Sequence, residues 1–223
     1  MDLLITIEAA LRTAQAYPDE GDSPSHIHRN RSKHFVEALA VHLRDLYSAQ
    51  TNLRVLSKHF DGYRHEFGLN ELLYDVLVCE TSTVLSAAEA TPLLFVTRGL
   101  WAVESEFARN SREAVHDFNK LVLAATESKL FVGPQVADEA AFIAPLLAPA
   151  VRCKGAVYVA LVTHPAEWRS VPPSVHLHRL HGDTWEPFHS EGGSPSAYQL
   201  AAADPAGVRK VGDALPPKTC ENE

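Results

Sequence analysis

The segment Trp101-Ala-Val-Glu-Ser-Glu-Phe107 carries two carboxylates, two residues apart, in a stretch that is otherwise largely apolar. Because alternate side chains of a β-strand point to the same face, Glu104 and Glu106 should lie side by side. Working outward, the preceding strand candidate is Leu72-Leu-Tyr-Asp-Val-Leu-Val78, which is apolar apart from Asp75. A strand that is apolar on both faces is usually buried on both faces. We therefore expect Asp75 at the centre of a buried strand, next to the strand of the two glutamates.

An ionised carboxylate in such a place costs free energy unless an opposite charge compensates it, and a divalent cation is the usual compensation. If the two strands bring Asp75 beside Glu104 and Glu106, at least one acid has a raised pKa unless a cation lies among them. Oxygen ligands without cysteine favour Mg²⁺ or Mn²⁺ over zinc. The pattern therefore predicts a magnesium or manganese site. The alternative is a set of surface acids on an exposed strand, which the apolar neighbours of Asp75 make less favourable.

A lysine follows in the segment Asp117-Phe-Asn-Lys-Leu-Val-Leu123. Asp117 and Lys120 are three residues apart, so on a helix they share a face. If this helix packs back onto the sheet, it brings Lys120 over the carboxylates, where a cation can stabilise transition-state charge. The alternative is a surface salt bridge between Asp117 and Lys120.

The order of apolar segments predicts the fold class. Helices are expected at 2–16, 32–50, 110–125 and 137–151, and further strands at 129–132, 155–162 and 175–180. Ser32 is the expected N-cap of the second helix, and Pro145 and Pro149 predict a break in the last one. The segment 175–180 alternates like a half-exposed edge strand, with Trp185 on its returning partner. This order predicts an α/β fold: a three-layer sandwich with a central mixed β-sheet flanked by helices.

Composition sets the domain organisation. With 223 residues, 46% of them hydrophobic, the chain can form one sizeable core, and a single folded domain is favoured over two. We expect an N-terminal helix and loop at 1–31, an α/β domain at 32–190 and a flexible tail at 191–223. The tail is predicted because Gly, Ser, Pro, Ala and charged residues dominate its composition.

The sequence favours a cytoplasmic protein with no membrane partner. No apolar run approaches the ~20 residues of a membrane span, and the N-terminus lacks the basic start of a signal peptide. The three cysteines, Cys79, Cys153 and Cys220, are odd in number and far apart. That spacing is typical of reduced thiols rather than of a disulfide framework.

The formal net charge is −8, from 20 basic and 28 acidic residues. Tight binding to nucleic acid of any sequence usually needs a basic surface, because neutralising phosphates supplies most of the affinity. A local basic patch can coexist with a negative total. The one basic cluster, His26-Ile-His-Arg-Asn-Arg-Ser-Lys-His34, precedes the helix expected at Ser32. It is either a nucleic-acid contact or a solvated loop.

Twelve histidines raise the question of a second metal site. His176 and His178 lie on one face of a predicted strand, with His181 just beyond. Such a pair could bind zinc or copper, but no acids or thiols nearby complete the site. Exposed histidines on an edge strand are the favoured interpretation.

Residues 32–165 resemble the restriction-endonuclease-like PD-(D/E)xK superfamily. The resemblance is carried by the order helix, acid-bearing strand, strand with E-x-E, crossing helix and strand. It implies a metal-dependent phosphodiesterase, in which Asp75 and Glu104 are metal ligands and the Ser105 carbonyl is a further ligand. Glu37, on the first helix of the matched region, would be a helper acid.

The chain departs from the superfamily motif at two positions. Tyr74 stands where the motif has proline, and Glu106 stands where it has lysine. The segment is similar to a group of members that read E-S-E followed by D-F-x-K-L, and some members place the lysine on the neighbouring helix. Lys120 is the candidate for that lysine.

The resemblance therefore implies a Mg²⁺- or Mn²⁺-dependent nuclease, with DNA a more probable substrate than RNA and with Glu106 helping the two metal ligands. The alternative is a catalytically inactive binding or regulatory subunit that keeps the nuclease fold. The net charge of −8 and the missing motif lysine favour this alternative. A homodimer through the strand at 175–180, or a different protein partner, would supply a second site or positive surface.

Overall fold

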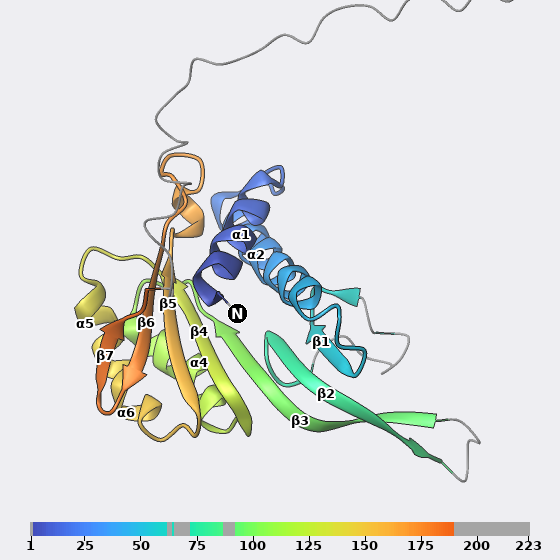
Figure 1. Cartoon of the computed structure of the whole chain (residues 1–223). Coiled ribbons are helices and arrows are strands. Elements are labelled where there is room, and N and C mark those ends of the chain that lie inside the picture. Colours follow the sequence, from blue (N-terminus) through green and yellow to red (C-terminus); the bar gives the residue numbers. More distant parts are fainter. Residues whose placement is uncertain (1, 62–63, 65–71, 87–91, 190–223) are drawn as a thin grey trace, which may run out of the picture. The chain divides into compact units, whose positions relative to one another are not determined.

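The computed structural model describes residues 2–61, 64, 72–86 and 92–189, so the tail predicted at 191–223 lies outside the described residues. The described part contains a seven-stranded mixed sheet in which the strands follow chain order (Figure 1). The strands are β1 (Leu53–Ser57), β2 (Val76–Leu85), β3 (Pro92–Ser105), β4 (Thr126–Pro134), β5 (Ala156–Val162), β6 (Val175–His181) and β7 (Thr184–Pro187). The helical elements are α1 (Leu3–Ala16), α2 (Pro24–Leu46), α4 (Ser111–Val122), α5 (Glu139–Ile143), η2 (Ala144–Leu146), α6 (Leu147–Ala150) and η3 (Pro165–Glu167).

The sheet mixes both strand directions. The neighbours β1, β2 and β3 are antiparallel, β3, β4 and β5 are parallel, and β5, β6 and β7 are antiparallel again. Parallel neighbours need a crossover connection. Helix α4 supplies it between β3 and β4, and α5, η2 and α6 supply it between β4 and β5. The predicted break at Pro145 and Pro149 is confirmed, since that segment divides into three short helices.

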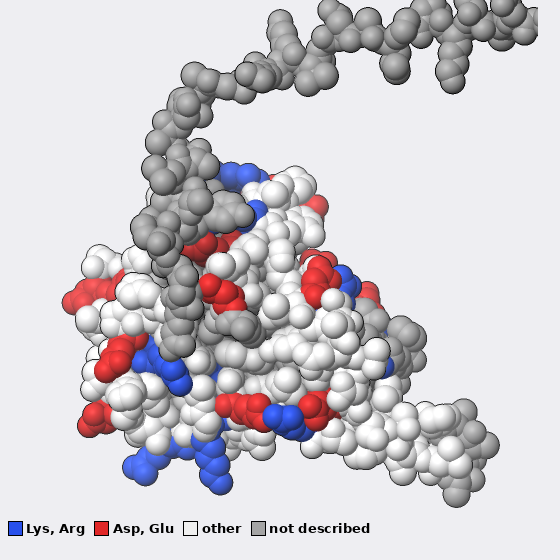
Figure 2. All heavy atoms as spheres, in the orientation of Figure 1, with Lys and Arg blue, Asp and Glu red and all other residues white. Residues whose placement is uncertain are grey.

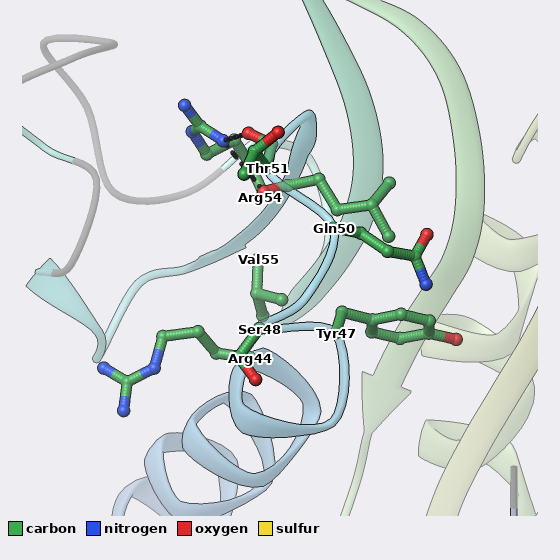
Figure 3. A pocket seen from close by; sticks show the side chains of 8 residues that line it. Arg44, Tyr47, Ser48, Gln50, Thr51, Arg54 and Val55 are labelled. Carbon is green, nitrogen blue, oxygen red and sulfur yellow. Dashed lines mark hydrogen bonds between the residues drawn. The ribbon is translucent and has the colours of Figure 1, made fainter.

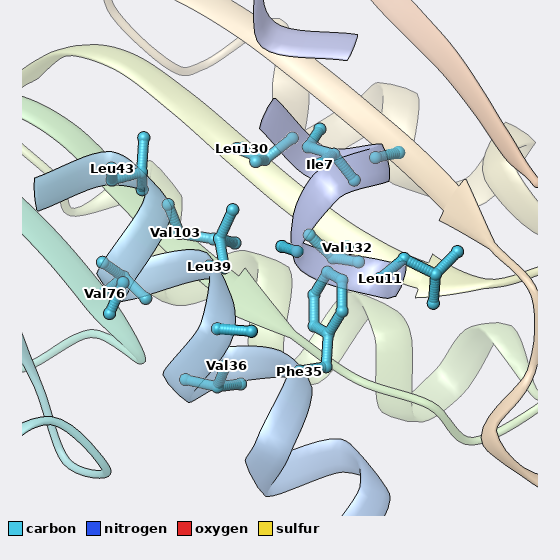
Figure 4. Packing of buried hydrophobic residues seen from close by; sticks show 14 of the residues in the cluster. Ile7, Leu11, Phe35, Val36, Leu39, Leu43, Val76, Val103, Leu130 and Val132 are labelled. Atoms are coloured by element: carbon cyan, nitrogen blue, oxygen red, sulfur yellow. The ribbon is translucent and has the colours of Figure 1, made fainter. Parts of the chain in front are cut away.

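Buried apolar side chains form a layer on each face of the sheet. On one face, α1 and α2 pack their apolar stripes against alternate residues of β3 and β4, as Figure 4 shows for Ile7, Leu11, Phe35, Leu39, Val103, Leu130 and Val132. On the other face, Phe118 and Leu121 of α4 pack against Phe131 of β4, which alternates with Leu130 and Val132. The fold is therefore α/β with helices on both faces, compatible with a three-layer sandwich.

The second helix begins earlier than the sequence suggests. It starts at Pro24, so the predicted N-cap at Ser32 is wrong. Ser23 is the cap, and its side chain accepts a hydrogen bond from the backbone N–H of His26. Proline is favourable at the first helical position because its fixed φ suits the helix. The backbone N–H that proline lacks would have no partner within the helix at that position. The basic segment 26–34 therefore lies on α2 rather than in a loop.

A buried arginine fastens this helix to distant parts of the chain. Arg31 is 8% exposed and donates to both carboxylate oxygens of Asp19, each at 2.8 Å, and to the carbonyl of Pro165. Arg169 also donates to Asp19, at 3.2 Å. The hydrogen bonds from Arg31 are the main reason that the pKa of Asp19 falls to about 2. This cluster holds α2 against the η3 segment.

The last two strands of the sheet, β6 and β7, differ from the prediction in which of them forms the edge. The strand predicted at 175–180 is β6, but it pairs with β5 on one side and β7 on the other, so it is not an edge strand. The partner strand predicted at Trp185 is present as β7 and forms the edge. Strand β7 therefore pairs with the edge of β6 through which the sequence predicted a homodimer.

Strands β2 and β3 continue past their neighbours as a two-stranded ribbon (Figure 1). Strand β1 pairs with β2 only over 76–80, and β4 pairs with β3 only from Gly99 onward. Four large apolar side chains of the ribbon are exposed: Val84, Leu85, Leu93 and Phe95. In Figure 2 the white part of the projecting ribbon shows no charged side chain on that face, in contrast to the mixed charges elsewhere on it.

Replacing Phe35 by alanine should lower the free energy of unfolding by about 3–5 kcal/mol, because its ring is fully buried and leaves a cavity. Phe95→Ala is the matched control, since 44% of Phe95 is exposed, and should cost far less. Urea denaturation followed by circular dichroism measures both. Equal losses would contradict the assignment of Phe35 to the core and of Phe95 to the surface.

Candidate functional site

The predicted acids meet where β2 begins and β3 ends. The antiparallel register pairs Val76 with Val103, so the residue before β2 lies beside the last residues of β3. Ser105 donates from its backbone N–H and from its hydroxyl to Oδ2 of Asp75, at 2.9 and 2.6 Å. The strand pairing and these two hydrogen bonds fix Asp75 against the Glu-Ser-Glu sequence.

The sequence predicted Asp75 at the centre of a strand, and this prediction is wrong. Strand β2 begins at Val76, and Asp75 is half-buried just before it. The preceding chain is irregular, because Leu73 takes a positive φ of 70° and Tyr74 pairs back to Leu72. The apolar residues on both sides of Asp75 thus belong to two different local structures, and the carboxylate emerges at the end of the sheet.

Glu104 is the buried acid of the site. Only 1% of its surface is exposed, and its Oε2 accepts a hydrogen bond from Nζ of Lys120 at 3.0 Å. Its other oxygen, Oε1, is buried without a hydrogen-bond partner among the described residues. Burial, and then the charge of Asp75, raise the pKa of Glu104 to about 8 in spite of Lys120. Without a further cation, this side chain is therefore largely protonated at neutral pH.

Lys120 reaches this position because α4 crosses back over the sheet. Asn110 caps the helix, and Phe118 and Leu121 bury its apolar face against the sheet. The ammonium of Lys120 lies 2.9 Å from Oδ1 of Asp117 as well as 3.0 Å from Glu104. Burial lowers the pKa of Lys120, but the hydrogen bonds to the two acids outweigh it and raise the pKa overall. The lysine remains a cation at the site.

Glu106 takes a different role from the one expected. It lies one residue beyond β3, and its Oε1 accepts a hydrogen bond from the N–H of Ala108 at 2.6 Å. Burial, and then a hydrogen bond with Asp117, raise the pKa of Glu106, with the Ala108 bond opposing them. The side chain is thus engaged with the β3–α4 connection.

Two residues that sequence reasoning missed, Tyr74 and His59, also lie at this site. Burial and then the charge of Glu104 raise the pKa of Tyr74. His59 is close enough to Asp75 and Glu37 for both to act on its pKa. Glu37, on α2, is itself 3.7 Å from Nδ1 of His34. Tyr74 stands at the motif position of proline and His59 lies outside the motif, so the sequence assigns neither of them a role at the site.

The oxygen donors suit a magnesium or manganese ion. In the described part of the chain, no three side chains of His, Cys, Asp or Glu are grouped so that they could hold a metal ion. Mg²⁺, however, is usually bound by one or two carboxylates, waters and substrate phosphates rather than by a cage of protein ligands. The unpartnered Oε1 of Glu104 and the neighbouring Asp75 fit such a site.

The histidines of β6 do not form a second metal site among the residues described. His176 contacts Oε2 of Glu139 through Nδ1, at 2.8 Å. His178 is half-buried, and burial lowers its pKa. The interpretation of these side chains as exposed histidines on an edge strand is therefore wrong in part, because β6 is paired on both sides and His178 is half-buried, whereas His176 is exposed.

A small pocket lies away from the carboxylates, at the turn between α2 and β1 (Figure 3). Its volume is about 100 Å³, and its lining includes Arg44, Tyr47 and Arg54. Arg44 is bound to Asp45 at 2.7 Å, and Arg54 donates to the carbonyl of Thr51, also at 2.7 Å. The pocket has no connection in its lining to the acids of the sheet.

Comparison of the chain with protein-family models, curated proteins and solved structures finds no match. Among the residues described, none of the helices combines the length and the apolar character needed to cross a bilayer. The chemistry of the site is therefore argued from its own geometry.

The raised pKa of Glu104 predicts how stability depends on pH. Between pH 4.5, its ordinary value, and about 8, the folded protein keeps a proton that the unfolded chain has released. The free energy of unfolding should therefore fall as pH rises through this window, by at most about 1.4 kcal/mol per pH unit. Glu104→Gln cannot ionise, so its melting temperature should fall less over the same range.

Thermal melts from pH 4.5 to 8 measure this difference. Glu186→Gln is the control, because Glu186 is exposed on β7 and its variant should follow the native curve. Parallel curves for Glu104→Gln and the native protein would show that the carboxyl has no raised pKa.

Proposed function

We propose that this chain is a metal-dependent nuclease with a restriction-endonuclease-like fold that hydrolyses phosphodiester bonds of nucleic acid, DNA more than RNA. One observation carries the proposal: Lys120 donates to buried Glu104 at the strand end to which Asp75 is hydrogen-bonded. Two carboxylates and one ammonium thus share one end of the sheet. Carboxylates for a divalent ion and a cation for phosphoryl charge are the groups that such a hydrolysis requires.

The order of elements supports the resemblance on which this proposal draws. Along the chain, α2 is followed by β1, β2 and β3, then by α4 and β4. The acids lie at adjoining ends of β2 and β3, and Lys120 of α4 would take the place of the lysine that the motif has at the position of Glu106. A displaced lysine would reach the metal-binding carboxylates from the helix in this way.

Each group would have a distinct task. Asp75 and Glu104 would hold the ion, with the Ser105 carbonyl as a further ligand. When bound, Mg²⁺ or Mn²⁺ polarises a phosphoryl oxygen and makes hydroxide available near neutral pH. Glu104 must first release its proton, and Lys120 is then placed to stabilise negative charge on the phosphoryl oxygens. Glu106 would help indirectly, by holding the β3–α4 connection through Ala108.

The second candidate is an inactive binding or regulatory subunit with the same fold. It is favoured by one observation, that Glu106 occupies the motif position of lysine and accepts a hydrogen bond from Ala108 in the loop that follows β3. In that case Lys120 would serve only as the partner of two acids, Glu104 and Asp117.

Cleavage of labelled single- and double-stranded DNA and RNA tests the proposal. The native protein should cut in Mg²⁺ or Mn²⁺ and not in EDTA, and Asp75→Asn and Glu104→Gln should not cut. Lys120→Met keeps the length of the side chain without its charge, and should cut about 10²–10³-fold more slowly. Glu186→Gln should cut like the native protein.

Mg²⁺ binding by calorimetry separates the two candidates further. The nuclease proposal requires that Glu104→Gln weaken binding of the ion. Native protein that is folded, binds no divalent ion and cuts no substrate would move the assignment to the inactive subunit.

A further inference from the structure

A tight turn places two polar residues beside Asp75. Ser57, at the end of β1, pairs with Val76, and the N–H of Phe60 donates back to the Ser57 carbonyl at 3.1 Å. Lys58 and His59 are the two central residues of this turn. Because Asp75 directly precedes Val76, the turn lies next to the carboxylate end of the sheet. Lys58 is exposed there, and His59 is half-buried.

Helix α2 adds a row of charged residues that leads to the same turn. Arg29, Lys33 and Glu37 are four residues apart, so they follow one stripe of the helix, each about 6 Å from the next along its axis. Burial first, and then Lys33 and Lys58, lower the pKa of His59, whereas Asp75 and Glu37 raise it. The stripe and the turn therefore face one another beside the site.

The cations of this region differ from the described basic side chains that an acid holds in an ion pair. Arg29, Lys33 and Lys58 are exposed, and no carboxylate or other hydrogen-bond partner holds them within the described ranges. Acids hold seven other basic side chains: Arg12, Arg31, Arg44, Arg98, Arg109, Lys120 and Arg169. In a chain with 28 acidic and 20 basic residues, three exposed cations grouped beside an acidic site are available to bind a negatively charged ligand.

We propose that Arg29, Lys33 and Lys58 form a phosphate track that binds successive backbone phosphates of one nucleic-acid strand and guides it to Asp75 and Glu104. The identity of the ligand rests on the proposed nuclease function. The face shown in Figure 2 carries mixed charges and no broad basic patch. The track also accounts for the basic segment 26–34, which the carboxylate site leaves unused. His59, between the two lysines, is placed to donate a hydrogen bond to the same backbone.

Binding can be measured apart from cleavage. Fluorescence anisotropy of a labelled DNA strand in EDTA, over a series of salt concentrations, compares the native protein with a Lys33→Ala, Lys58→Ala double variant. Loss of two phosphate contacts should weaken binding about tenfold or more at low salt. It should also lower the slope of log affinity against log salt by about 1.4–1.8.

A matched control removes two exposed cations at the opposite end of the sheet. Arg152 and Lys154 precede β5, at the end of the parallel strands away from Ser105. The Arg152→Ala, Lys154→Ala variant has the same net charge as the test variant and should bind like the native protein. Circular dichroism verifies that both double variants are folded.

The outcomes keep this inference separate from the nuclease proposal. Selective loss of binding in the Lys33/Lys58 variant supports the track, even if no protein cuts any substrate. The track is wrong if both double variants bind equally or if the native protein binds no nucleic acid, whatever the cleavage assay shows.

Discussion

The hydrogen bond between Lys120 and Glu104 is the interaction on which the site depends. A carboxylate that is 1% exposed is costly to keep in ionised form, and a single ammonium on α4 is what lowers that cost. The bond also joins β3 to the helix that crosses to β4. The same hydrogen bond therefore balances the charge of Glu104 and fixes the position of the crossover helix α4 on the sheet.

The site is built from both faces of the sheet. From one face, α4 supplies Lys120 and Asp117; from the other, α2 supplies Glu37 and the row that leads to Lys33. The ends of β2 and β3 lie between these two helices, and the hydrogen bonds from Ser105 to Asp75 hold them together. A substrate at this end would meet acids in the middle and cations on both sides.

Much of the fold follows from local pattern. The apolar spacing predicts α1, α4 and the buried strands, and the three-residue spacing of Asp117 and Lys120 predicts their shared face. The failures have definite causes. The polar residues after Pro24 hide the true start of α2, although Ser23 followed by proline is itself a capping signal.

The remaining differences at the site depend on tertiary structure. Asp75 was placed inside a strand because an apolar segment does not reveal the positive φ of Leu73 that interrupts it. Period-two alternation placed Glu106 beside Glu104, but β3 ends at Ser105 and the loop captures the side chain. His59 could not be found from the sequence, because only the pairing of β1 with β2 brings its turn beside Asp75.

Strand β3 runs from the most exposed part of this sheet to a part that is buried between helices. The last residues of β3 are enclosed by helices on both faces, whereas its first residues, with those of β2, stand in a ribbon with exposed apolar side chains. No helix among the described residues covers this ribbon, and a two-stranded ribbon alone is marginally stable in water. Local opening should therefore begin there and stop near Gly99, where β4 joins the sheet. Opening of the ribbon at one end of β3 would thus leave the acids at the other end in position.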